Sequence, residues 1–314
     1  MISVNLKEAA AFLMGCDGCL IYTHASPDGD TIGSATALAL ALRAKGKKAY
    51  AFCADGIPQK LSFLPTEDVF VNEEDESLTA ISVDVASEKL LGKANNTHFA
   101  LSIDHHKVNA MDCERLLCLS DRVSCGEIIF MLAEELGAEL SKDMATAIYT
   151  AICSDSGGFK YEATKSETYV MAAKCIDAGG DFADINRRLF ENKTPYQVAL
   201  IKTAYHNLEL LRDGRFAIVA ISPEEVKQCG ASEMDFDCIN SIPREIEGVM
   251  ASAVIRMKSD GVKVSLRSND DIDVAEIAKR YGGGGHYHAA GFNLGFDFAK
   301  AVETVRNAFL ELSI

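Results

Sequence analysis

The chain has 314 residues, of which 48% are hydrophobic and 25% are charged, a composition typical of a folded globular protein with one large or two ordinary domains. No apolar run approaches the roughly 20 residues that a membrane-spanning helix needs. The first residues lack the basic start of a secretory signal, so we expect a cytoplasmic protein with no membrane partner. The net charge of −15 argues against a long nucleic-acid duplex as partner, whereas a small anion held through metal ions is compatible with it.

The first half of the chain alternates between short apolar runs and helical patterns. The expected strands are the runs at 19–24, 48–54, 78–85 and 97–106. The expected helices lie at 31–46, 124–137 and 143–153. This alternation predicts an α/β domain with a parallel sheet covered on both faces, and ligands of such sheets bind beyond the carboxyl ends of the strands.

The pattern changes in the second half of the chain. Helices are expected at 165–180, 182–192 and 195–214, strands at 215–221, 248–259 and 262–268, and an amphipathic helix at 297–312. An Asp260-Gly261 hairpin turn is expected to join the last two strands. We therefore expect a first domain over 1–187, a helical linker over 188–214 and a smaller α+β domain over 215–314. The acidic run at 72–77 is expected to be a solvated loop.

Aspartate and histidine residues gather where the apolar elements of the first half stop. They are His24, Asp28, Asp30, Asp84, Asp104, His105, His106 and Asp155. Because a parallel sheet brings the ends of its strands together, we expect these side chains to meet. Carboxylates and imidazoles without thiolates suit Mn²⁺, Mg²⁺, Fe²⁺ or Co²⁺ better than structural zinc. Two such cations sharing one carboxylate would activate a water and clamp a phosphoryl oxygen.

Each of these motifs also has a simpler structural interpretation. "SPDGD" contains the usual turn residues, and "DHH" can be a capped strand end. The C-x-x-C pair of Cys16 and Cys19 has no second pair at a suitable distance, so we assign it to core packing rather than to zinc or redox chemistry. The conjunction of the motifs, in order and at strand ends, favours a metal centre.

The segments "HASPDGDTIGS", "VD", "IDHH" and "SDSGGF" resemble, in chain order, the four signature motifs of the DHH phosphoesterase superfamily. "GGGGHYHAAGF" resembles the signature of the C-terminal domain associated with that superfamily. The resemblance covers essentially the whole chain. Its short length is similar to the nanoRNase/pAp phosphatase (NrnA-like) subfamily rather than to the longer RecJ exonucleases.

The resemblance implies a role for each of these aspartates and histidines. By resemblance, His24 and Asp28 hold one metal, and Asp30, His105 and Asp155 hold the second. Asp84 bridges the two metals. Asp104 would orient a neighbouring ligand. His106 would face the substrate, as a polariser of the phosphate or as a proton donor to the leaving oxygen.

A second group of candidates lies in the C-terminal third. Four consecutive glycines at 282–285 let backbone N–H groups approach an anion, although such a run can also be a flexible hinge. An arginine at a strand end usually faces solvent, but the resemblance implies that Arg267 and the histidine after the glycines hold a terminal phosphate. The expected substrate contacts are Arg267, Ser268, Gly283, Gly284, Gly285 and His286. For His288, packing and substrate contact are equally compatible with the sequence.

The resemblance implies a two-metal phosphodiesterase/phosphatase with Mn²⁺, with Mg²⁺ or Co²⁺ as alternatives, acting by hydroxide attack on phosphorus. Its substrates would be short RNA oligonucleotides, cut to mononucleotides, and 3′-phosphoadenosine 5′-phosphate (pAp), converted to AMP. The alternatives are a cyclic or linear dinucleotide phosphodiesterase acting on c-di-AMP or pApA, an inorganic pyrophosphatase and a non-catalytic nucleotide sensor. The sequence leaves open the cleavage direction, the physiological metal and the oligomeric state, a dimer included.

Overall fold

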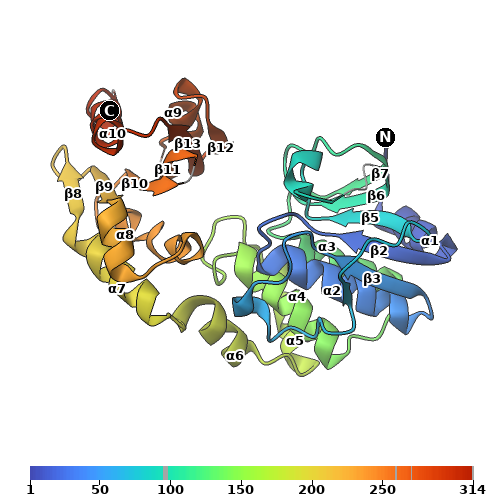
Figure 1. Ribbon diagram of the computed structural model, residues 1–314. Helices are drawn as coiled ribbons and strands as arrows, with labels where there is room; N and C mark the ends of the chain where they lie inside the picture. The colour runs from blue at the N-terminus through green and yellow to red at the C-terminus, as the bar shows by residue number, and fades with distance from the viewer. Residues whose placement is uncertain (95–97, 259, 270, 313–314) are drawn as a thin grey trace. The chain divides into compact units, whose positions relative to one another are not determined.

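The computed structural model describes residues 1–94, 98–258, 260–269 and 271–312 (Figure 1). The chain separates into two compact units, Met1–Asn192 and Lys193–Ile314. Within the described ranges, no helix combines the length and the apolar character needed to cross a bilayer.

A seven-stranded parallel sheet forms the centre of the first unit. Its strands are β1 (Ile2–Ser3), β2 (Gly18–Tyr22), β3 (Lys48–Phe52), β4 (Phe70–Val71), β5 (Thr79–Val83), β6 (Phe99–Asp104) and β7 (Cys113–Cys118). They lie in the order β1-β7-β6-β5-β2-β3-β4, and each neighbouring pair is parallel. The predicted parallel sheet is therefore confirmed. Because β6, β5 and β2 are neighbours, the polar residues that follow them emerge side by side at one edge.

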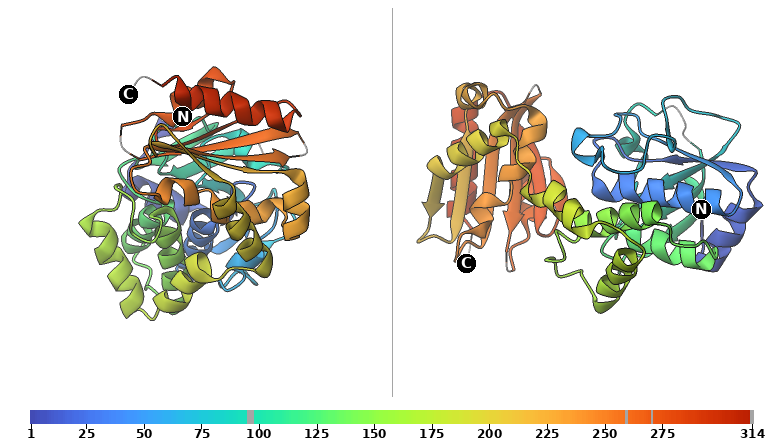
Figure 2. Two further views of the ribbon diagram at one scale, coloured as in Figure 1. Left: turned by 90° about the vertical axis from the view of Figure 1, so that its left-hand side faces the viewer. Right: turned by 90° about the horizontal axis from the view of Figure 1, so that it is seen from below.

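The α-helices of the first unit contribute to a single core on one face of this sheet (Figures 1 and 2). They are α1 (Leu6–Gly15), α2 (Gly29–Ala44), α3 (Cys125–Glu135), α4 (Lys142–Asp155), α5 (Ser166–Asp177) and α6 (Phe182–Asn186), which continues into a π-helical turn at Arg187–Glu191. The sequence predicts a sheet covered on both faces. The second face is covered by loops and by the 3₁₀ turn Glu88–Leu91, and not by α-helices, among the residues described.

Alternation along β2 shows how one short sequence serves both faces. Cys19 and Ile21 point into the helical core, whereas Leu20 and Tyr22 belong to the core on the opposite face. All five residues of the strand are buried, as expected for a central parallel strand.

Helices α2 and α4 pack closely because small residues line their contact. A Cβ atom at Gly33 of α2 would lie 2.5 Å from the carbonyl oxygen of Ala147 and 3.1 Å from the Cβ of Ala151. The alanine-rich stretch of α2 is buried over most of its length. This close packing holds the start of α2 and the end of α4, both of which carry candidate ligands, in a fixed relation.

The second unit is built on a six-stranded mixed sheet. Its strands are β8 (Leu208–Leu211), β9 (Phe216–Ile221), β10 (Ala251–Lys258), β11 (Gly261–Ser268), β12 (Gly284–His286) and β13 (Ala289–Leu294), in the order β12-β13-β11-β10-β9-β8. Helices α9 (Val274–Arg280) and α10 (Phe298–Leu310) pack on one face. The other face carries α7 (Pro195–His206), α8 (Pro223–Cys229) and the 3₁₀ segments Glu233–Ile239 and Ile242–Glu245.

The predicted helix over 195–214 is wrong in its last third. The helix α7 ends at His206, and the next residues form β8, with Leu208 opposite Val219 of β9. Asn207 ends the helix by donating its side-chain amide to the carbonyl oxygen of Ala220 and to Glu225, at 2.9 and 2.8 Å. These contacts connect the chain to β9 and α8, and a pattern confined to the segment does not show them.

Candidate metal centre

The loop after β2 carries the first two candidate ligands. Asp28 is the N-cap of α2, and its Oδ1 accepts the backbone N–H groups of Asp30 and Thr31 at 3.0 and 3.1 Å. The Nδ1 of His24 lies 2.9 Å from the carbonyl oxygen of Ala25. Its other ring nitrogen, Nε2, lies 3.8 Å from Asp28 Oδ1. One imidazole nitrogen is therefore held by the backbone while the other faces a carboxylate.

Asp84 follows β5 and stands between two of the histidines. Its backbone has a left-handed φ of +60°, and its N–H donates to the carbonyl oxygen of Ile103 at 2.9 Å. Asp84 Oδ2 lies 3.6 Å from the Nε2 of His24, and Asp84 Oδ1 lies 3.5 Å from the Nε2 of His105. Only 3% of Asp84 is exposed. Its two oxygens thus face histidines that follow different strands.

Asp30 is fully buried in the first turn of α2 and is held by three hydrogen bonds. Its Oδ1 accepts from the Ser34 hydroxyl and the Gly126 N–H at 2.9 Å each, and its Oδ2 accepts from the Cys125 N–H at 2.7 Å. The two backbone donors are the first residues of α3, so the start of one helix holds a carboxylate on another. Asp30 Oδ2 also lies 3.7 Å from the Nε2 of His105.

Asp155 completes this side of the site from the end of α4. Its Oδ2 lies 3.4 Å from the Nε2 of His105. The Nδ1 of that ring lies 3.3 Å from the carbonyl oxygen of Arg122. As with His24, one ring nitrogen contacts a backbone carbonyl and the other faces carboxylates, the arrangement expected of a metal-binding histidine.

Asp104 lies beneath the two histidines that follow it. It is fully buried and accepts the backbone N–H of His105 at 2.8 Å, the side-chain amide of Asn109 at 2.6 Å and the Nδ1 of His106 at 2.7 Å. The bond to Asp104 raises the pKa of His106 above its ordinary value, although burial partly opposes this. Asp104 therefore orients both histidines of the motif.

The side chains form three overlapping groups. Within each group, the potential ligand atoms lie within 4.8 Å of one another. The groups are His24, Asp28 and Asp84; Asp30, His105 and Asp155; and Asp84, His105 and His106. Two of these atoms, Asp84 Oδ1 and His105 Nε2, are buried without a hydrogen-bond partner. A buried oxygen and a buried ring nitrogen with no hydrogen-bonding partner fit a site that holds cations, since ligation would satisfy both atoms.

The pKa values of the two inner histidines express the excess of negative charge. Burial lowers the pKa of His24, but the carboxylates of Asp28 and Asp84 outweigh it and raise the pKa to about 11. Burial likewise lowers the pKa of His105, and Asp155 and Asp84 raise it to about 12. The surrounding carboxylates thus favour the charged form of both histidines.

The pKa values of two carboxyl groups are raised as well, because burial and nearby negative charges disfavour their ionised form. Burial raises the pKa of Asp30 well above its ordinary value, and repulsion from Asp84 and Asp155 raises it further. Burial also raises the pKa of Asp155, against a lowering by His105. Bringing these groups together is unfavourable unless cations neutralise them, which is the electrostatic condition for divalent metal binding.

In the second unit, the predicted anion contacts lie on β11 and on or just before β12, two strands that are separated by β13. Arg267 of β11 is opposite Ala289 of β13, which is in turn opposite His286 of β12. Ser268 is buried, and its hydroxyl lies 3.0 Å from the Nδ1 of the exposed His288. The side chain of His286 lies outside the described part of the structure.

Two of the predicted glycines are needed for close backbone approach between strands. A Cβ at Gly283 would lie 2.2 Å from the carbonyl oxygen of Gly291. Gly285 has φ +146°, and a Cβ there would lie 2.5 Å from the carbonyl oxygen of Ala289. Gly284 has open space beside it. The run thus forms a strand pair rather than a hinge, and its glycines have a structural role in addition to any anion contact.

Comparison with known proteins agrees with this geometry. Residues 19–152 match the DHH family, N-terminal domain, and residues 225–311 match the DHHA1 domain. The chain is 33% identical over 316 aligned residues, covering 98% of this chain and 94% of the relative, to a Thermus thermophilus protein named bifunctional oligoribonuclease and PAP phosphatase NrnA. The chain belongs to the DHH family and to its NrnA-like subfamily. A Streptococcus mutans protein named probable bifunctional oligoribonuclease and PAP phosphatase NrnA is 28% identical, over 91% of this chain and 93% of that protein.

A solved structure supports the fold of this DHH protein. The crystal structure of an exopolyphosphatase-related protein from Bacteroides fragilis matches with a TM-score of 0.87 at 23% identity, covering 96% of this chain and 94% of that chain. At this identity the likeness concerns the fold alone.

The DHH site contains groups that the sequence did not reveal. Asn109 bonds Asp104, and the N–H groups of Cys125 and Gly126 bond Asp30. A signal for Asn109 was its position three residues after the DHH motif. Backbone donors leave no signature in the side-chain sequence, and the contact to Asp30 spans 95 residues.

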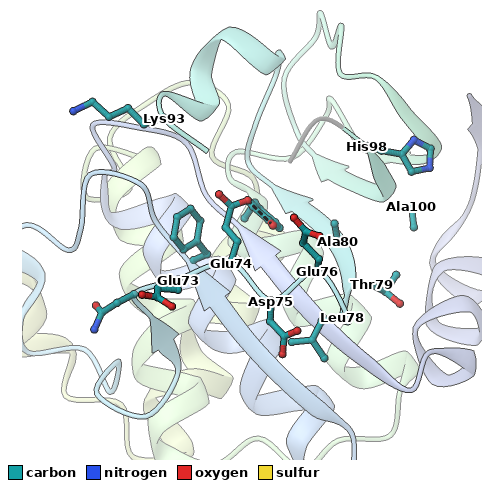
Figure 3. Close-up of a pocket in the computed structure, with 13 residues that line it drawn as sticks. Glu73, Glu74, Asp75, Glu76, Leu78, Thr79, Ala80, Lys93, His98 and Ala100 are labelled. Carbon is teal, nitrogen blue, oxygen red and sulfur yellow. Dashed lines mark hydrogen bonds between the residues drawn. The ribbon is translucent and has the colours of Figure 1, made fainter. Parts of the chain in front are cut away.

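The DHH domain also has a cavity of about 780 Å³ that none of the eight predicted residues of the metal centre lines (Figure 3). It lies over the sheet face opposite the helices and is lined in part by the acidic run predicted as a solvated loop. The Tyr22 hydroxyl donates to Glu74 of that run at 2.9 Å. The run thus contacts β2, an interior strand, on that face of the sheet.

Proposed function

We propose that this protein is a two-metal phosphoesterase that hydrolyses short oligoribonucleotides to mononucleotides and converts pAp to AMP. The observation that carries the proposal is the convergence of six potential ligands from three strand ends and two helices, with Asp84 facing both His24 and His105. The names of the Thermus and Streptococcus relatives support the choice of substrates.

The proposed ligand assignment follows two of the three groups and uses the contact of Asp84 with His105 for the bridge. His24 and Asp28 would hold one cation, Asp84 would bridge, and the second would be held by Asp30, His105 and Asp155. When bound, two divalent cations at such a site activate a water and stabilise the charge on the phosphoryl oxygens. Oxygen and imidazole ligands without thiolates fit Mn²⁺, and Mg²⁺ or Co²⁺ are the alternatives to test.

His106 is the residue that we propose to act on the leaving group. Asp104 accepts the Nδ1 proton of His106 and raises its pKa, which favours the imidazolium form. In that form the Nε2 proton is available for transfer to the ribose 3′ oxygen as the bond to phosphorus breaks. Asp104 would thereby set the tautomer, the orientation and the charge of the proton donor.

The second unit would hold the far end of the nucleotide. Arg267 can bind a phosphate through two parallel N–H groups. Ser268 lies on the same strand, and the glycines at 283–285 and His286 lie on or just before β12, which is separated from β11 by β13. The net charge of −15 agrees with a substrate of a few nucleotides rather than a long duplex. We also propose a cytoplasmic location, where such fragments of RNA arise.

The test is a substrate panel with the purified protein. With Mn²⁺, we expect AMP from both pApA and pAp, loss of both activities in excess chelator, and recovery on adding the metal back. Faster hydrolysis of c-di-AMP than of pApA would favour the cyclic-dinucleotide alternative. Tight binding of pApA without turnover in Mn²⁺, Mg²⁺ and Co²⁺ would contradict the enzymatic proposal.

A further inference from the structure

Glu127 is a buried carboxylate near the candidate metal centre, and it takes no direct part in the proposed reaction. Glu127, in the first turn of α3, is 1% exposed. Its Oε2 accepts the backbone N–H of Val123 at 3.1 Å, and its Oε1 accepts the Thr168 hydroxyl at 2.5 Å. Both donors are neutral, so this carboxylate is buried at an electrostatic cost and binds the start of a helix to the segment before it.

The first connection leads from Glu127 to Asp30. Ser124, the N-cap of α3, accepts the backbone N–H of Glu127 at 3.3 Å, and Glu127 in turn holds the residue before the cap. The next two residues, Cys125 and Gly126, donate their N–H groups to Asp30 at 2.7 and 2.9 Å. The network around the cap therefore sets the direction of the donors that hold Asp30.

The second connection leads from Glu127 to His105. The residue before Val123 is Arg122, whose carbonyl oxygen lies 3.3 Å from the Nδ1 of His105. That contact leaves the Nε2 of His105 facing Asp30 and Asp155 at 3.7 and 3.4 Å. Holding the Val123 N–H thus also fixes the adjacent carbonyl that orients the histidine.

Thr168 anchors the network from a third element. It lies in the first turn of α5, and its Oγ1 accepts the backbone N–H of Lys165 at 3.1 Å. Because a carboxylate oxygen can only accept, the Thr168 proton is directed to Glu127. One carboxylate consequently ties together α3, the segment before it and the start of α5.

We infer that Glu127 is a positioning residue, which acts through Arg122 and the first amides of α3 to hold Asp30 and His105 in place for one of the two cations. The inference rests on the proposed metal assignment. The inferred effect concerns only that one cation. His24 and Asp28, proposed to hold the other cation, come from the loop after β2, and the hydrogen bonds of Glu127 to Val123 and Thr168 do not involve that loop.

The experiment measures Mn²⁺ binding to the full chain by titration calorimetry and by electron paramagnetic resonance. The wild type should bind two Mn²⁺ ions and give the signal of a coupled pair. Glu127→Leu should weaken one of the two binding events by about 10–100-fold, as expected when a group that supports a ligand is lost. At intermediate Mn²⁺ it should give the six-line signal of a single ion.

Two further variants distinguish positioning from general stability. In Glu127→Gln, the amide oxygen can accept from Val123 and the NH₂ group can donate to the Thr168 oxygen, so most of the affinity should return. Ile129→Ala removes a buried side chain from the same helix without touching the network, and it should lower the melting temperature while leaving both Mn²⁺ affinities unchanged. Thr168→Val removes the hydrogen bond to Glu127 together with the one from the Lys165 N–H. It should give an intermediate loss and serves in place of Glu127→Leu if that variant does not fold.

Each outcome is decisive. Unchanged binding of both ions by folded Glu127→Leu, or by Thr168→Val in its place, would overturn the inference, and so would an equal loss of affinity in Ile129→Ala at equal destabilisation. Binding of fewer than two Mn²⁺ ions by the wild type would instead overturn the two-cation proposal itself.

Discussion

Asp84 is the position where a single substitution tests the shared carboxylate most severely. It faces His24 with one oxygen and His105 with the other, at 3.6 and 3.5 Å, and it is 3% exposed. Its backbone φ of +60° decides which variant to make. Asn tolerates the left-handed region, whereas Ala would add backbone strain to the loss of the carboxylate, so Asp84→Asn isolates the charge.

The size of the effect follows from the charges. Two unit charges 4 Å apart interact by about 4 kcal/mol at an effective dielectric constant of 20. Removing one partner from a buried charged set costs about 3–5 kcal/mol, which is roughly a hundred- to several-thousandfold in an equilibrium or rate constant. We therefore expect Asp84→Asn to lose that factor in the hydrolysis of pApA at a fixed Mn²⁺ concentration.

The assay compares Asp84→Asn with Asp112→Asn, an exposed aspartate whose loss changes the net charge equally. The control should keep wild-type rates. If Asp84→Asn hydrolyses pApA within a factor of ten of the wild type over a range of Mn²⁺ concentrations, then Asp84 is not a shared ligand and the reasoning fails.

Three further predictions concern packing, substrate contact and pH. Gly33→Ala would place a Cβ 2.5 Å from a backbone oxygen of α4 and should lower the free energy of unfolding, measured in urea, by about 1–3 kcal/mol. Gly15→Ala has open space for its Cβ and should be nearly neutral, and equal effects of the two substitutions would contradict the packing account. Arg267→Ala should raise the KM for pAp about 10–100-fold with a smaller change in kcat, and the exposed Lys300→Ala should not; a pure loss of kcat would argue against a binding role. Mn²⁺ affinity should rise with pH across the neutral range, because the raised pKa values of His24 and His105 mean that Mn²⁺ binding must release their protons. Calorimetry in two buffers of different ionisation enthalpy measures the released protons. Binding that does not depend on pH would refute this prediction.

The sequence supports prediction of the central strands because their patterns are strong. β2, β3, β5 and β6 are apolar runs, and the ends of β2, β5 and β6 coincide with the polar motifs of the predicted site. The two-residue strands β1 and β4 are too short to leave a pattern, and β1 pairs with β7 across more than a hundred residues. Residues 208–211 are compatible with helix or strand, and only the partner β9 decides between them.

The candidate site likewise has a part that the sequence predicts and a part that it does not. Side chains that would touch a cation are visible in the sequence, since His24, Asp84 and Asp155 stand where apolar elements stop. The groups that hold those side chains are largely backbone atoms, such as the carbonyl oxygen of Arg122 and the N–H of Cys125. Their positions depend on the folded contacts of α3, so they could be found only from the structure.

The most direct test of the central claim is a crystal structure of the protein with Mn²⁺, read at the anomalous scattering edge of manganese. Two anomalous peaks should lie in the site, one contacted by His24 and Asp28 and the other by Asp30, His105 and Asp155, with Asp84 touching both. A single peak, or peaks that share no carboxylate, would contradict the account.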